Sequence, residues 1–259
     1  MKIAAFSRTR YSLVILASCL SLQSVGIGIY IAFGVFFTPM IEEFGCSRDA
    51  ISGASAMAFF LAGLFGVGVG RLNDRMGPRI ILMVTTVFFS VGLMMMAAMN
   101  NLWELYLFFG VIFGFGMSPV DVIALTTIAR WFPENRGMMT GITKVGTGTG
   151  QLVFPLLASF LISGYGWRSA CVIIGVVALF LMMIIALLLK KEPDEKQLSE
   201  SGRDGQKVLD AQKQDQAASL TLTQASKTVQ FWLICLINFT ILICLMSIMV
   251  HIVAHARDI

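Results

Sequence analysis

The chain of 259 residues is 57% hydrophobic and only 13% charged, and it carries a net charge of +4. Soluble domains contain about 25% charged residues, so this composition excludes an ordinary soluble globular protein. The basic residues flank long apolar segments, so the positive charge is a signal of membrane topology and gives no support to nucleic-acid binding.

Apolar runs of about 20 residues, long enough to cross a lipid bilayer, recur along almost the whole chain. Backbone groups in lipid must be satisfied within a segment, and no alternation typical of barrel strands is present, so these runs are predicted to be helices. The sequence therefore predicts an all-α, polytopic membrane protein. The expected spans are Leu13–Phe37, Ile51–Gly70, Ile80–Met99, Leu105–Ala129, Met138–Ile162, Ala170–Leu189 and Phe231–Val253.

The basic residues predict how these spans are oriented. With a cytoplasmic N-terminus, the outer segments hold only Arg48, Arg168 and Arg257. The cytoplasmic segments then hold the lysines after Leu189 together with Lys2, Arg8, Arg10, Arg71, Arg75, Arg79, Arg130 and Arg136. This asymmetry follows the positive-inside rule, so we expect the N-terminus to be cytoplasmic.

The first two predicted spans carry polar and small residues on defined faces. Gln23 and Tyr30 are seven residues apart and share one helix face, where they either line a cavity or hydrogen-bond a neighbouring helix. Small residues recur every four positions in the second span, which lets helix backbones approach closely. This stripe fits static packing among the first six spans or a sliding contact with a second bundle. Its members are Ala54, Ala58, Ala62, Gly66 and Gly70.

The segment from Gly70 to Arg79 reads GRLNDRMGPR and lies between the second and third spans. Its aspartate, Asp74, can accept N–H bonds at a helix N-terminus, and its arginines can pair with carboxylates or with the carbonyls that end a helix. A loop that only sets the topology would need the arginines and not the aspartate.

Two ionisable residues within apolar spans are the strongest functional clues. Asp121 precedes Arg130 by nine residues and Lys144 follows Arg136 by eight, which places both roughly 12–13 Å from the cytoplasmic ends of their helices. A charge in mid-membrane costs about 2.5–3.5 kcal/mol on insertion scales, so each should have a partner or line water. We hypothesise an ion pair that an anionic substrate, or a proton on Asp121, can open. A fixed structural pair or a snorkelling lysine are the alternatives.

The spans fall into groups along the chain. Residues 1–189 contain six spans with short loops, and the polar residues 190–227 are expected to form a cytoplasmic linker. Residues 228–259 contain the seventh span, in which Asn238 is a further cavity candidate. The sequence has no His/Cys ligand cluster and no nucleophile–base set, so it predicts no metal site, no cofactor and no enzyme activity.

The hairpin between the second and third spans carries a resemblance to a known family. It resembles the corresponding loop of the major facilitator superfamily of secondary transporters, whose usual form is G-x-L-(A/G)-D-R-x-G-x-R. Asn73 and Pro78 depart from this form. The residues that match are Gly70, Leu72, Asp74, Arg75, Gly77 and Arg79.

A second stretch, from Arg130 to Gly137, reads RWFPENRG and precedes a glycine-rich segment. It is similar to the loop and fifth helix of the branch that contains monocarboxylate transporters and oxalate–formate antiporters, where W/Y-F-x-x-x-R-G opens a glycine-rich helix. The acidic-Gly-Gly-aromatic signature of animal monocarboxylate carriers is absent from the first span. The resemblance therefore favours the bacterial side of this branch, and with it a bacterial inner membrane, and it leaves the substrate open.

The resemblance implies twelve spans in two six-helix repeats that rock around a site at the membrane midplane. It implies symport or antiport of a small, monocarboxylate-like organic anion, with a proton as a candidate coupling ion. The chain would then be the N-terminal bundle plus the seventh helix, a truncated product or fragment that lacks the C-terminal bundle. We expect such a fragment to be inactive in transport on its own.

By the same resemblance, the hairpin acts as a cytoplasmic gating latch between the two bundles, formed by Gly70, Asp74, Arg75, Gly77 and Arg79. The alternative function is a seven-helix receptor or sensor that binds a small ligand without transporting it. That interpretation explains neither the hairpin nor the plan of six short-looped spans and a linker. A retinal protein would also need a lysine within the last span, where none lies.

Overall fold

The computed structural model describes residues 10–133, 135–190, 224 and 226–241. The chain forms two compact units, residues 1–211 and residues 212–259. The described part of the first unit is built from helices, as the sequence predicts. In order they are α1 (Arg10–Ala32), η1 (Phe33–Phe36), α2 (Phe37–Phe44), α3 (Arg48–Met76), α4 (Pro78–Met96), α5 (Leu102–Leu105), η2 (Tyr106–Phe113), α6 (Gly114–Met117), α7 (Pro119–Trp131) and α8 (Arg136–Leu188).

Five helical runs among the described residues are long and apolar enough to cross a membrane. The first four correspond to the first four predicted spans, and the fifth contains the next two. A 3-10 turn, η1, lies within the first run, and a π-helical segment, η2, lies within the fourth. The runs are Tyr11–Phe44, Arg48–Met76, Pro78–Met96, Leu102–Trp131 and Arg136–Leu188.

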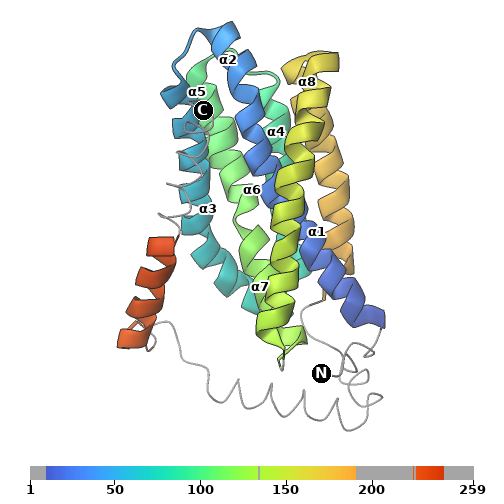
Figure 1. Ribbon diagram of the computed structural model, residues 1–259, viewed down its shortest axis with the longest axis vertical. Helices are drawn as coiled ribbons and strands as arrows, with labels where there is room; N and C mark the ends of the chain where they lie inside the picture. The colour runs from blue at the N-terminus through green and yellow to red at the C-terminus, as the bar shows by residue number, and fades with distance from the viewer. Residues whose placement is uncertain (1–9, 134, 191–223, 225, 242–259) are drawn as a thin grey trace, which may run out of the picture. The chain divides into compact units, whose positions relative to one another are not determined.

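The fifth run is helix α8, which holds two predicted spans in one assignment of 53 residues. A straight helix of that length would be about 80 Å long, more than twice the roughly 30 Å hydrocarbon core. The helix is broken at Gly166, whose φ of 78° and ψ of 160° lie outside the helical region. A positive φ favours glycine because it has no Cβ. The chain reverses there, so the two halves of α8 run in opposite directions in Figure 1.

The second unit contributes one described apolar helix, Val229–Ile241. It covers the first part of the predicted seventh span, and residues 242–253 of that span lie outside the described residues. Most of the predicted linker also lies outside them. The boundaries proposed for residues 1–189, 190–227 and 228–259 therefore stay predictions.

Helix α1 packs against both α7 and α8. A Cβ atom added to Gly146 or Gly150 of α8 would collide with the backbone carbonyl oxygen of Leu20 or Ser24 in α1. Only glycine at these two positions allows the backbones of α1 and α8 to come so close, as in other small-residue helix contacts in membranes. The first half of α8 is therefore held directly on α1.

Glycine also brings α7 close to α1. A Cβ on Gly26 of α1 would lie 2.6 Å from Val120 Cγ1 of α7, too close for any side chain without a shift. The two helices that carry Asp121 and Lys144 thus both press on the same stretch of α1.

The small-residue stripe of α3 faces the fourth span within the same unit. Ala58 and Gly66 are buried, and a Cβ on Gly66 would lie 3.6 Å from Val122 Cγ2 of α7. A Cβ on Gly114 of α6 would lie 2.8 Å from the Ala58 carbonyl oxygen. The stripe therefore serves packing inside this bundle.

At the end of the bundle opposite the hairpin, hydrogen bonds to Glu43 and from Arg168 join several segments. Arg168 Nη2 donates to Glu43 Oε1 at 2.5 Å, and Trp167 Nε1 donates to Glu43 Oε2 at 2.6 Å. Arg168 Nη1 also donates to the carbonyl oxygens of Ala97 and Met99 at 2.9 and 3.0 Å. At the end opposite the hairpin, these bonds tie α2, the residues that follow α4 and the second half of α8 together.

Substitution of Gly150 by alanine should lower the thermal unfolding midpoint, because the new methyl group would meet the Ser24 carbonyl oxygen. Overpacking of this kind typically costs about 1–3 kcal/mol. Gly164→Ala is the matched control in the same helix, since a Cβ there meets nothing within 4 Å. It should be neutral or add up to about 1 kcal/mol, because alanine is the better helix former. Equal midpoints for the two purified variants in detergent would contradict the close contact.

Candidate functional site

Four polar side chains from three helices meet inside the first unit, and we call them the polar cluster: Gln23, Asp121, Lys144 and Thr147. Lys144 Nζ of α8 lies 2.5 Å from Asp121 Oδ1 of α7. Gln23 Nε2 of α1 donates to the same carboxylate oxygen at 2.8 Å. Thr147 Oγ1 of α8 donates to Gln23 Oε1 at 3.2 Å. The structure thus brings together Asp121 and Lys144, the pair that the sequence hypothesis names, and adds Gln23, which that hypothesis did not place with them.

The polar cluster is buried on one side and open on the other. The Gln23 side chain is fully buried, while the side chains of Lys144 and Asp121 are 42% and 50% exposed. A paired charge in an apolar helix avoids much of the cost of an isolated one, which explains how both are tolerated. The described helices of the first unit therefore leave about half of each charged side chain uncovered.

Close helix packing places these groups. Thr147 lies between Gly146 and Gly150, so the face of α8 that touches α1 also presents the threonine hydroxyl to Gln23. Asp121 follows directly after Val120, which contacts Gly26 of α1. The local sequence therefore sets the meeting point of the three helices.

Two other predicted cavity residues, Tyr30 and Asn238, bond to backbone carbonyl oxygens. Tyr30 donates its hydroxyl to the Ser55 carbonyl oxygen of α3 at 3.2 Å, and its ring lies parallel to Phe109 with centroids 6.4 Å apart. Asn238 belongs to the second unit, where its Nδ2 donates to the Ile234 carbonyl oxygen of its own helix at 2.9 Å. Within the described first unit, Tyr30 does not join the polar cluster.

The hairpin residues lie at the end of the bundle where α3 meets α4 (Figure 1). The expectation of a loop is wrong here, because Asp74 and Arg75 belong to the last turn of α3 and Arg79 to the first turn of α4. Asp74 Oδ1 accepts a hydrogen bond from Arg130 Nη2 of α7 at 2.6 Å, so an arginine side chain binds the carboxylate here. Gly77 separates the two helices with a φ of 82°, a value that favours glycine. Arg75 and Arg79 are exposed, and among the described residues neither is paired with a carboxylate.

Gly70, the first residue of the hairpin motif, is half-buried and faces α7. A Cβ on it would lie 3.8 Å from Val122 Cγ1, an ordinary packing distance. The motif is therefore joined to α7 by the ion pair of Asp74 and, about one helical turn earlier, by the packing of Gly70 on Val122.

Sequence reasoning missed two partners at these sites. Arg130 was assigned only a topological role, although it binds Asp74. Thr147 was not singled out, although it binds Gln23. The spacing of Gly146 and Gly150 around Thr147 was the available signal, because small residues four apart mark a helix face in close contact.

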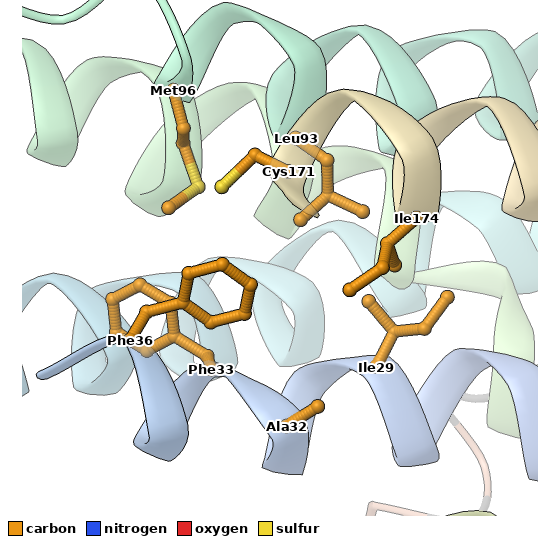
Figure 2. A pocket seen from close by; sticks show the side chains of 8 residues that line it. All are labelled: Ile29, Ala32, Phe33, Phe36, Leu93, Met96, Cys171 and Ile174. Atoms are coloured by element: carbon orange, nitrogen blue, oxygen red, sulfur yellow. The ribbon is translucent and has the colours of Figure 1, made fainter. Parts of the chain in front are cut away.

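A separate cavity lies between α1, η1, α4 and the second half of α8 (Figure 2). Its walls are apolar apart from one cysteine thiol, so it offers no group that would bind an anion. Within the described ranges, no three His, Cys, Asp or Glu side chains gather to hold a metal ion. The polar cluster is therefore the candidate site for a charged solute. The cavity is lined by Ile29, Ala32, Phe33, Phe36, Leu93, Met96, Cys171 and Ile174.

Comparison with protein families gives a match of residues 15–257 to the major facilitator superfamily. Monocarboxylate transporter 11 of Homo sapiens is 30% identical over 176 residues, which cover 68% of this chain and 37% of that protein. MFS-type transporter 1 of Ophiocordyceps sp. (strain BCC 1869) is 34% identical over 143 residues, which cover 55% and 32%. The aligned part of the chain thus spans less than two fifths of the length of these relatives.

Solved structures show the same fold. The xylose transporter XylE from E. coli, in an inward open conformation, matches with a TM-score of 0.65 at 16% identity, covering 83% of this chain and 58% of XylE. A bacterial homolog to the human lysosomal transporter Spinster matches with a TM-score of 0.61 at 22% identity, covering 72% and 46%. At such identities the likeness concerns the fold alone.

The ion pair predicts a charge-exchange result. Asp121→Lys and Lys144→Asp should each lower the free energy of unfolding, because each puts two like charges side by side. We expect about 1–2 kcal/mol, less than the 3–5 kcal/mol of a fully buried pair, since both side chains are about half exposed. The double exchange should recover part of this loss in thermal unfolding. A double variant no more stable than either single variant would show that the pair contributes nothing.

Proposed function

Because the chain belongs to the major facilitator superfamily, we propose that it serves the secondary active transport of a small, monocarboxylate-like organic anion. Its membership of this family and its long apolar helices identify the chain as a multi-pass integral membrane protein of a transporter family. This membership favours transport over the receptor alternative. The relatives named are human and fungal, so the bacterial inner membrane and the cytoplasmic N-terminus stay predictions.

The observation that carries the proposal is the half-exposed ion pair of Asp121 and Lys144. An ammonium group whose counter-ion is an exposed carboxylate can exchange that partner for the carboxylate of a solute. The entering anion takes the place of Asp121 at Lys144, and a proton on Asp121 opens the pair in the same way. The similarity to monocarboxylate transporter 11 supports a monocarboxylate as this anion.

We place the anion site within residues 1–189 and the start of a second bundle within residues 228–259, joined by the linker 190–227. Transport then follows alternating access, in which two bundles rock about a site between them. The hairpin latches the bundles, and the Asp74–Arg130 pair holds it against α7.

Equilibrium binding of radiolabelled pyruvate to the purified chain in lipid nanodiscs tests the anion site. Lys144→Met should raise the Kd about 10- to 100-fold, because it removes a charge-assisted contact worth about 1.5–3 kcal/mol. Lys227→Met is the matched control, since it removes the same charge outside the first unit's helices. No saturable binding, or equal binding by Lys144→Met and the original chain, would overturn the proposal.

The latch predicts that Asp74→Asn, made in a protein that carries both bundles, lowers pyruvate uptake without lowering the amount of protein in the membrane. The substitution removes the charge that binds Arg130. Asp49→Asn is the control, because it neutralises an exposed carboxylate in the first turn of the same helix, α3. Uptake that is equal in both variants and in the original protein would remove this role from Asp74.

A further inference from the structure

Both protein donors to Asp121 bind the same carboxylate oxygen. Lys144 Nζ and Gln23 Nε2 lie 2.5 and 2.8 Å from Oδ1. Among the described residues no donor is bonded to Oδ2, and the side chain is 50% exposed. The carboxylate is thus fixed at one oxygen and open at the other.

The Gln23 amide can donate to Asp121 in only one of its two orientations. Its nitrogen faces Asp121 and its oxygen accepts the Thr147 hydroxyl. A rotation of the amide by 180° would set Oε1 against the carboxylate oxygen, two acceptors without a proton between them. The side chain is fully buried, so water does not compensate.

Thr147 differs from the neighbouring threonines of α8. The hydroxyls of Thr143 and Thr149 donate to carbonyl oxygens of their own helix, at Met139 and Gly146, both at 2.9 Å. Bonding to the preceding turn is the common habit of threonine in a helix. The Thr147 hydroxyl instead crosses to Gln23 on α1.

We propose that Thr147 is a positioning residue, which fixes the Gln23 amide so that its N–H holds Asp121 when Lys144 turns to an entering anion. For the role of Lys144 in anion binding, this inference rests on the proposed function. With the N–H in place, Asp121 keeps a donor after it loses Lys144. Without it, the exchange would take from Asp121 both of its protein donors among the described residues, so Lys144 would stay paired more of the time.

The test compares Thr147→Val, which removes the hydroxyl and keeps the shape, with Thr147→Ser, which keeps the hydroxyl. The first readout needs no ligand: the acetylation rate of Lys144 by acetic anhydride in the full chain in nanodiscs, measured by mass spectrometry relative to Lys227. Thr147→Val should slow acetylation about tenfold, because Lys144 leaves Asp121 less often. The weakened Gln23–Asp121 bond is charge-assisted, and the lower end of its range, about 1.5 kcal/mol, corresponds to this factor. Thr147→Ser and the control Thr149→Val should react at the original rate.

A merely structural role gives the opposite sign. Loosened packing would expose Lys144 and speed its acetylation. The second check is Gln23→Ala, which should itself slow the reaction and make Thr147→Val silent, since Thr147 acts only through Gln23. Faster or unchanged acetylation in Thr147→Val, or a further effect of it in Gln23→Ala, would overturn the proposal.

Pyruvate binding separates this inference from the proposed function. Thr147→Val should raise the pyruvate Kd about tenfold and Thr147→Ser should leave it unchanged. If acetylation responds as predicted and pyruvate does not bind, the anion-site proposal fails and the positioning role of Thr147 holds. If pyruvate binds and acetylation in Thr147→Val is unchanged, the positioning role fails alone.

Discussion

The close backbone contact between α1 and α8 is the constraint on which the rest of the site depends. Gly146 and Gly150 lie directly on the carbonyl groups of Leu20 and Ser24, where no larger residue fits. Thr147 sits between the two glycines and therefore meets α1 at the same place. A buried amide such as that of Gln23 costs free energy unless its polar atoms are bonded, and in an apolar bundle only protein groups are available. Helix packing and hydrogen bonding thus specify the same geometry.

The centre of the bundle and its two ends are held in different ways. The end opposite the hairpin is tied by several bonds to Arg168, including two to backbone carbonyls, which leaves little freedom. At the hairpin end, the Asp74–Arg130 pair is exposed, and an exposed pair contributes only about 0–1 kcal/mol. The pair at Lys144 is half exposed and shares its acceptor with an amide.

The sequence predicted the parts of this structure that depend on composition. Apolar runs marked the spans, because a membrane helix needs about 20 apolar residues whatever it packs against. Asp121 and Lys144 were found because charges inside such runs are rare. Thr147 was missed because a threonine that bonds its own helix and one that bonds a neighbour look alike in sequence. Arg130 was missed as the partner of Asp74 because a basic residue at a helix end already has a topological explanation. Contacts between side chains far apart in the sequence can be identified only once the fold is known.

The most direct test of the anion site is the position of a heavy-atom carboxylate in crystals of the chain. Anomalous diffraction from crystals grown with 3-bromopropionate locates the bromine without any assumption about the site. The account predicts a bromine peak beside the polar cluster, with the ligand carboxylate on Lys144 Nζ and Asp121 held by Gln23. A peak elsewhere in the bundle, or no peak with Lys144 still on Asp121, would contradict it.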